Sequence, residues 1–250
     1  MKNDLSEKRI RSFYNFEGEI NILPTVDSTN SFARRLIKSG KGKEQVIIAK
    51  QQTVGRGRRG NSFFSPDSGL YYSYIHRAFD VPNETADTIL AATAACQAAE
   101  VASGTYPMIK WVNDLYLGDR KVAGILCEKI QDINLIDWII IGIGFNIGTL
   151  EFPDDLKSKA TSLPENTDRS LLAAELTKHL CAYLNNQNNS EILSYYRNRS
   201  LVLGEKISYI ENGIYHSGIA EAIQDDGTLE VKEGDGTHCV RSGEVSIHRE

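Results

Sequence analysis

The sequence lacks a membrane-spanning apolar run, a CxxC cysteine pair and an excess of positive charge. Its longest apolar stretch, residues 135–145, contains an aspartate and is too short to cross a bilayer. The first residues form no apolar signal segment, so we expect a cytoplasmic protein that binds no membrane. The four cysteines show no metal-like spacing with the five histidines. We therefore expect reduced thiols in packed positions, and the metal ligands are unknown.

The net charge is negative, at −5 with an isoelectric point near 5.6. This balance disfavours a dedicated nucleic-acid-binding protein, so a basic segment is a local feature whose ligand we expect to be small. Of the 250 residues, 41% are hydrophobic and 24% are charged. That composition is typical of a folded protein with one large domain, or with a large and a small domain.

Residues 51–69, QQTVGRGRRGNSFFSPDSG, combine flexible backbone with fixed positive charge. Glycines let backbone N–H groups approach a ligand, and guanidinium groups bind phosphate or carboxylate oxygens in pairs. The segment predicts an anion clamp, with a solvated basic turn or a DNA minor-groove arm as alternatives. Apolar strands predicted at 46–52 and 69–75 would hold the loop at the end of a sheet, which favours the clamp. The glycines are Gly55, Gly57 and Gly60, and the arginines are Arg56, Arg58 and Arg59.

The chain before this loop predicts an irregular start, a strand and a helix. Residues 1–18 are polar, residues 19–26 favour a strand, and the apolar spacing after DSTN (27–30) predicts a helix that ends near Gly40. The four DSTN residues are typical helix N-caps. Four exceed the needs of one cap, however, and the hydroxyls and N–H groups of a helix start also suit a bound carbonyl or ureido group.

The middle of the chain predicts a helix and a β-hairpin. Residues 83–104 form an Ala-rich helix that Asn83 caps and Gly104 ends. A strand begins near Met108, and residues 115–130 predict a hairpin.

Residues 135–148 predict a buried central strand because of their isoleucines. Gly142 and Gly144 interrupt that strand, which indicates either a β-bulge or a close approach to the backbone.

The C-terminal third divides into a helical part and a β part. Residues 168–186 and 190–200 predict two helices, which we interpret as scaffold. From about residue 202 the sequence changes to five short strands with tight turns, which predicts a small barrel.

Five motifs, taken in order, resemble those of the biotin protein ligases, of the type that lacks an N-terminal DNA-binding domain. The motifs are DSTN (27–30), QQTVGRGRRG (51–60) with FFSPDSGLYYS (63–73), KWVND (110–114), RKVAGILCE (120–128) and GIGFN (142–146). The resemblance implies an α+β fold like that of class II aminoacyl-tRNA synthetases, with a mixed sheet flanked by helices. It also implies a catalytic domain over residues 1–201 and an SH3-like β domain over residues 202–250.

The same resemblance implies an ATP-dependent enzyme. Biotin and MgATP would give biotinyl-5′-AMP and pyrophosphate, and a lysine of a biotin carboxyl carrier protein domain would then attack the mixed anhydride. The cofactors would be ATP and Mg²⁺, with biotin as substrate. A homodimer is one option for the oligomeric state, which the sequence leaves open.

The roles of individual residues follow from the resemblance, position by position. Lys121, Arg56 and Arg58 would be the catalytic cations, and Arg59 would help to bind the adenylate. The other residues expected to bind biotin are Ser28, Thr29, Asn30, Gln52, Gly55, Gly57, Gly124 and Gly142. The other residues expected to bind ATP are Phe63, Trp111, Asn113 and Asn146.

Two further points remain open at this level. A lipoate or octanoate ligase of the same fold is the alternative enzyme, and a non-enzymatic nucleic-acid-binding module is a third interpretation, which the acidic charge disfavours.

Strict strand alternation would place Lys121 on the face of Ala123 and opposite Gly124, so an exposed structural lysine competes with a catalytic one.

Overall fold

The computed structural model describes residues 5–78, 84–149, 151–185, 190–211, 213–241 and 243–248. The first part of the chain comprises α1 (Glu7–Phe13), β1 (Glu19–Val26), α2 (Thr29–Lys38), β2 (Gln45–Gln52), β3 (Leu70–Arg77), α3 (Glu84–Ser103), β4 (Met108–Lys110), β5 (Asp114–Leu117), β6 (Arg120–Gln131) and β7 (Asp137–Phe145). The second part comprises α4 (Arg169–Leu184), α5 (Ser190–Asn198), β8 (Lys206–Glu211), β9 (Ile214–Ile223), β10 (Leu229–Glu233), β11 (Gly236–Val240) and β12 (Val245–Ile247). The predicted cap Asn83 lies outside the described residues.

A seven-stranded mixed sheet forms the centre of the molecule, in the order β1-β2-β3-β7-β6-β5-β4. Strands β1 and β2 are parallel and the remaining neighbours are antiparallel. The isoleucine-rich β7 lies in the middle, as its sequence predicts. Its register with β3 and β6 stays regular through Gly142 and Gly144, so these glycines mark a close approach and not a bulge.

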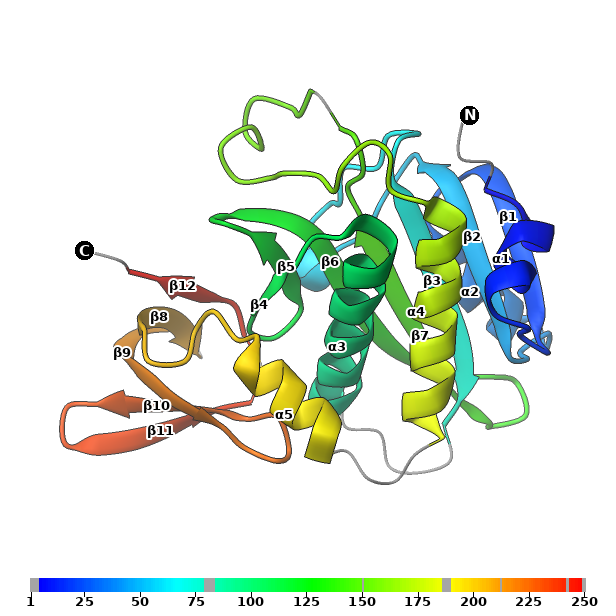
Figure 1. Cartoon of the computed structure of the whole chain (residues 1–250). Helices are drawn as coiled ribbons and strands as arrows, with labels where there is room; N and C mark the ends of the chain where they lie inside the picture. Colours follow the sequence, from blue (N-terminus) through cyan, green and yellow to red (C-terminus); the bar gives the residue numbers. More distant parts are fainter. Residues whose placement is uncertain are drawn as a thin grey trace.

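The two faces of this sheet are covered unequally. Helices α3 and α4 lie side by side across one face (Figure 1), and most buried apolar residues gather there. The alanines of α3 between Ala91 and Ala99 are fully buried, which lets the helix pack closely on the sheet. Helix α2 covers the other face with a much smaller cluster that includes Ala33, Ile37 and Ile140. This second face is therefore only partly filled by apolar side chains.

The prediction of an irregular N-terminus was wrong, because residues Glu7–Phe13 form helix α1. Its apolar residues are few and dispersed, so no helical periodicity shows in the sequence. Ile10 is nonetheless only 1% exposed, and Arg9 pairs with Asp168, the N-cap of α4. Tertiary packing against α4 stabilises a segment whose own pattern is weak.

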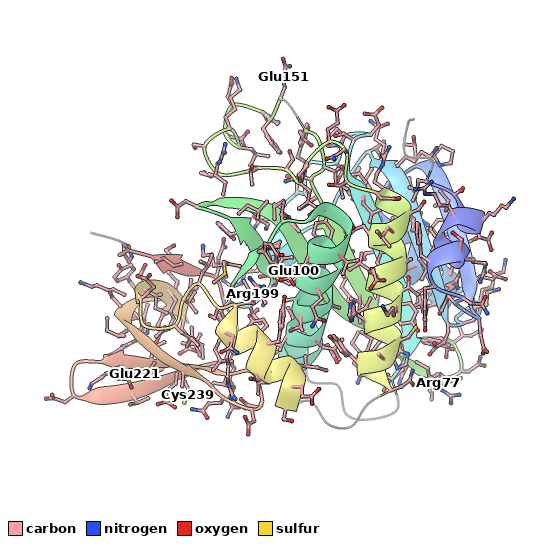
Figure 2. The ribbon with its side chains drawn as sticks, viewed as in Figure 1. Arg77, Glu100, Glu151, Arg199, Glu221 and Cys239 are labelled. Atoms are coloured by element: carbon pink, nitrogen blue, oxygen red, sulfur yellow. The ribbon has the colours of Figure 1, made fainter. Side chains whose placement is uncertain are left out.

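The five predicted C-terminal strands form a separate antiparallel sheet in the order β11-β10-β9-β8-β12. This sheet lies beside the end of α5 (Figure 1). Several contacts join it and α5 to the first part of the chain, among them those of Trp111 and Arg199. The indole Nε1 of Trp111 donates to Gly227 O at 3.0 Å. Arg199 pairs with Glu100 of α3 at 2.6 Å, and Figure 2 labels these two residues close to one another.

None of the helices in the described ranges is long and apolar enough to cross a membrane.

Candidate active site

A cavity opens on the face of the large sheet that α2 covers only in part. Its empty volume is about 790 Å³, a part of which is open to solvent. The start of α2, the end of β2, the arginine loop and strands β6 and β7 surround it. The predicted site residues on its lining are Ser28, Thr29, Asn30, Gln52, Arg56, Gly57, Arg58, Arg59, Phe63, Asn113, Lys121, Gly124 and Gly142.

The floor of the cavity consists of strand positions without side chains. A Cβ atom at Gly142 would collide with the amide of Asn30, and one at Gly144 would lie 2.7 Å from the ring of Phe63. The paired residue Gly124 of β6 also faces Phe63, with its Cβ position 3.3 Å from the ring. Glycine is thus required on adjacent strands because other groups lie directly over the backbone.

The DSTN segment does not act as a plain helix cap. Ser28 occupies the N-cap position of α2 without a side-chain capping hydrogen bond. Thr29 instead donates to Gln52 Oε1 from its backbone N at 2.8 Å and from its hydroxyl at 3.2 Å. Gln52 in turn donates to Ser65 Oγ at 3.0 Å. These side chains form a polar end of the cavity. Ser28 makes no side-chain capping hydrogen bond, so the alternative of plain N-capping was wrong.

The outer residue of this motif, Asp27, has a structural partner. Arg35 donates to both carboxylate oxygens of Asp27, at 2.6 and 2.8 Å. This hydrogen bonding lowers the pKa of Asp27 from 3.8 to about 2. Asp27 is therefore a stable anion that fixes the start of α2, directly before Ser28 of the cavity lining.

Asn30 is held from three sides. Its Nδ2 donates to Leu126 O at 3.1 Å and to Glu128 Oε2 at 2.9 Å, and its Oδ1 accepts from Ser73 Oγ at 2.7 Å. Because Asn30 is only 3% exposed, these bonds fix both its position and its amide orientation.

The arginine loop is ordered by its own backbone and by partners from distant segments. Gly57 N donates to Asn61 O at 2.7 Å, and Phe63 N donates to Gly55 O at 2.9 Å. Arg56 pairs with Glu128 of β6, with nitrogen–oxygen distances of 3.1 and 3.2 Å. The loop thus closes on itself, with one of its cations held by a carboxylate of the sheet.

Arg58 of the same loop meets neutral acceptors instead. It donates to Asn113 Oδ1 at 3.2 Å and to Gly243 O at 3.3 Å. Gly243 belongs to the loop before β12, so the C-terminal sheet reaches the cavity. Gly243 and Glu244 both line it.

Lys121 points into the cavity, but strict alternation does not predict this. Its ammonium lies 2.7 Å from Asp114 Oδ1 and 3.2 Å from the Cβ position of Gly124. The register of β5 and β6 shifts here, since Leu115 pairs with Ala123 and Tyr116 with Lys121, which leaves Val122 extra. This bulge brings Lys121 to the face of Gly124, so the predicted placement on opposite faces was wrong.

Three predicted residues do not line the cavity. Gly55 packs under the loop, where a Cβ would collide with Phe63 O and Ser65 Oγ. Trp111 is buried against the C-terminal sheet, and Asn146 donates to Thr161 O at 3.0 Å behind β6. Each supports a neighbouring segment of the site in this structure.

The prediction also omitted several residues that the fold brings to the cavity or its rim. Glu128 ends the RKVAGILCE motif and Asp114 ends KWVND, so both were within reach of motif reasoning. Tyr71 lies within the motif at 63–73 and was within reach as well, whereas Gly243 and Glu244 carried no such signal. Burial raises the pKa of Tyr71, whose hydroxyl donates to Pro66 O at 2.7 Å, so its phenol stays neutral.

The arrangement gathers four cations around one cavity, namely Arg56, Arg58, Arg59 and Lys121. Two of them rest on carboxylates that a stronger anion can replace. Such a site can hold two anions close together and neutralise charge that develops between them, while the polar end near Gln52 binds a hydrogen-bonding head group.

Two sequence families match this chain. The Biotin/lipoate A/B protein ligase family matches residues 22–146, and the Biotin protein ligase C terminal domain matches residues 202–247. The bifunctional ligase/repressor of Escherichia coli is 31% identical over 92% of this chain and 74% of its own length. The biotin–[acetyl-CoA-carboxylase] ligase of Mycobacterium tuberculosis is 29% identical over 91% of this chain and 88% of its own.

Among solved structures, the biotin protein ligase of Aquifex aeolicus in complex with biotin and ATP superposes with a TM-score of 0.81. It is 27% identical to this chain, and the match covers 94% of this chain and 100% of that one. The expected fold is therefore confirmed, both for the mixed sheet flanked by helices and for the SH3-like C-terminal part. With the motifs, the cavity and these matches together, this chain belongs to the biotin protein ligase family.

Proposed function

We propose that this protein adenylates biotin with ATP and then transfers the biotinyl group to a lysine of a biotin carboxyl carrier protein domain. The observation that carries the proposal is the convergence of Arg56, Arg58 and Lys121 on one cavity whose other end is the polar Thr29–Gln52 pair. The adenylation step needs that combination, because it joins two anions while an uncharged ring is held in place.

In the first half-reaction, a carboxylate oxygen of biotin attacks the α-phosphorus of ATP. A carbon-bound oxygen becomes bonded to phosphorus, and the bond from phosphorus to the bridging oxygen of the β-phosphate breaks, so pyrophosphate leaves. Lys121 would lie between the carboxylate and the α-phosphate, with Arg58 beside them. These residues would neutralise the charge on the phosphorus centre, and no protein base is needed because the nucleophile is already ionised.

The binding of biotin would use the polar end of the cavity. The hydroxyls of Ser28 and Thr29 and the amide of Gln52 can bond a ureido group, while Gly142 leaves room for the bicyclic ring. Phe63 would cover the ligand from the loop side, since its ring already packs on Gly144.

The donor set of the cavity fits magnesium carried by ATP. Mg²⁺ bound to phosphates keeps several waters and needs only one or two protein carboxylates. Asp114 and Glu244 line the cavity and would hold it. Across the described residues, no group of three or more His, Cys, Asp and Glu side chains gathers as a metal site. When bound, the ion would shield the charge of the phosphates that leave.

In the second half-reaction, the lysine amine of the carrier attacks the carbonyl carbon of biotinyl-5′-AMP. The new bond is an amide, AMP leaves with the anhydride oxygen, and the amine loses one proton. The same proposal includes the carrier as acceptor and the domain division at residues 201/202. It also includes a homodimeric state and a cytoplasmic location.

Pyrophosphate exchange tests this function directly. The purified protein is incubated with ATP, labelled pyrophosphate and biotin, lipoate or octanoate, and label that enters ATP is measured. We expect exchange with biotin alone, since the polar Thr29–Gln52 end would leave unpaired groups against an apolar tail. If lipoate or octanoate supported exchange as fast as biotin or faster, the assignment of biotin as the specific substrate would be refuted. If no acid supported exchange, the ligase activity itself would be refuted.

A further inference from the structure

Glu128 of β6 pairs with Arg56 of the arginine loop but does not itself line the cavity, and motif reasoning assigns it no role. Its side chain is 12% exposed, and two arginines converge on it. Arg56 meets both of its oxygens, and Arg34 of α2 donates to Oε1 at 2.6 Å. Asn30 adds a hydrogen bond to Oε2 at 2.9 Å.

The two arginines differ in what they can reach. Both side chains are exposed to a similar degree, 38% for Arg56 and 41% for Arg34, but Arg56 also lines the cavity, so its guanidinium can leave Glu128 and turn to an anion inside. Arg34 is not among the described residues on the cavity lining, so it stays beside Glu128. One carboxylate is thus shared between a cation that can move to the ligand and one that cannot.

This sharing decides how easily Arg56 can change partners. A buried carboxylate that loses its counter-ion is strongly destabilised, whereas one that keeps an arginine and an amide donor is not. Because Arg34 and Asn30 remain on Glu128, Arg56 can move to a phosphate or carboxylate without leaving an unpaired charge behind.

We infer that Glu128 is a positioning residue for the proposed adenylation, holding Arg56 at the cavity until the ligand anion replaces it, and that Arg34 is the cation that makes this exchange possible. The inference rests on the proposed function and adds two residues to it, neither of which touches the ligand. It links the start of α2, which binds the acid, to the loop that closes over the phosphate.

The exchange can be tested with a double-mutant cycle. Removing Arg34 should slow adenylate formation only while Glu128 carries its charge. In Arg34→Gln, Arg56 becomes the sole cation on Glu128. Adenylate formation should then slow by roughly tenfold, because moving Arg56 to the ligand leaves the Glu128 carboxylate without a cation. In Glu128→Gln with Arg34→Gln, no anion retains Arg56, and most of the lost rate should return.

Single-turnover formation of biotinyl-AMP at saturating biotin and ATP measures this cycle. Arg34→Lys keeps a cation and should stay within a few-fold of the parent. Lys38→Gln is the matched control, since Lys38 is another cation of α2 and donates to Gln131 O instead. A double variant as slow as Arg34→Gln alone, or an Arg34→Gln variant as fast as the parent, would overturn the inference.

A second measurement needs no catalysis. Without ligands, trypsin should cleave after Arg56 several-fold faster in Glu128→Gln than in the parent, because the loop loses its anchor on β6. Equal cleavage would refute the hold on Arg56. If the parent forms no adenylate from biotin, the proposed function fails, while this cleavage still tests the anchor separately.

Discussion

Strand β7 presents two very different faces to the rest of the molecule. Toward α3 and α4 it carries a continuous apolar row, Ile139, Ile141, Ile143 and Phe145. Toward α2 it begins in the same way, with Trp138 and Ile140, and then continues with Gly142 and Gly144. The change from isoleucine to glycine on one face coincides with the start of the cavity.

The comparison shows how one strand serves stability and binding at once. The face toward α3 and α4 belongs to the larger cluster of buried apolar residues, and burial of apolar surface is the main source of folding free energy. The face toward α2 has glycines where the side chains of Asn30, Phe63 and Lys121 approach the backbone of β6 and β7. Substitutions on the two faces should therefore have separable effects, and the predictions below test that separation.

The largest effect is expected from Lys121 on the cavity face. Lys121→Met removes a cation beside the reacting phosphate, and adenylate formation should slow by roughly two to three orders of magnitude, as for the loss of an oxyanion donor. The fold should survive, because the ammonium is partly exposed. Single-turnover kinetics measure the first step, and transfer from pre-formed adenylate measures the second. A rate within a few-fold of the parent would show that the arginines suffice.

A methyl group at Gly142 should weaken biotin binding as well as the fold. In Gly142→Ala the new Cβ collides with the Asn30 amide, which should lower the free energy of unfolding by about 1–3 kcal/mol. Because Asn30 lines the cavity, its displacement should also weaken biotin binding roughly tenfold, or about 1.4 kcal/mol. Calorimetric titration with biotin measures the affinity.

Ile141→Val on the opposite face of β7 is the control for that variant. It should lower the free energy of unfolding by about 1 kcal/mol and leave the biotin affinity unchanged. If both variants affected affinity and stability alike, the two faces would not be independent.

The arginine loop should be protected by ligands, unlike the helical face. With biotin and ATP together, trypsin cleavage after Arg56, Arg58 or Arg59 should slow several-fold, because the adenylate ties down residues 53–64. Cleavage sites on α4 serve as the reference and should not change. Equal cleavage of the loop with and without ligands would contradict its role as an anion clamp.

The smallest effect is a pH dependence on the helical face. Burial lowers the pKa of His179 on α4 from 6.5, against the attraction of Glu175. The unfolded chain therefore binds a proton more readily, so this contribution to stability is present above pH 6.5 and is lost as the pH falls below it. One proton limits the slope to about 1.4 kcal/mol per pH unit. Thermal unfolding of the parent and His179→Gln between pH 8 and 5.5 should converge at the acidic end.

Much of the fold was predictable, because its elements carry strong local patterns. The strand at 19–26, the hairpin at 115–130 and the five C-terminal strands all form as expected. Helix α1 was missed, because its stability comes from contacts with α4 and not from its own apolar spacing. The side of β6 on which Lys121 lies was also missed, since a bulge depends on how two strands pair.

The site shows the same division. The motifs predicted which segments would meet, and thirteen of the sixteen named residues line the cavity. They did not predict the partners of the two loop arginines, because an ion pair depends on which strand edge lies opposite the loop.

The sequence by itself determined where this chain has flexible backbone, fixed charge and apolar periodicity, since these are properties of single segments. Only the tertiary structure decided that Arg56 meets Glu128, 72 residues away, and that Arg58 meets Gly243, 185 residues away. The order of the strands and the docking of the C-terminal sheet create those contacts. Both result from the packing of whole elements, because apolar burial places strands and sheets without regard to which polar groups then become neighbours.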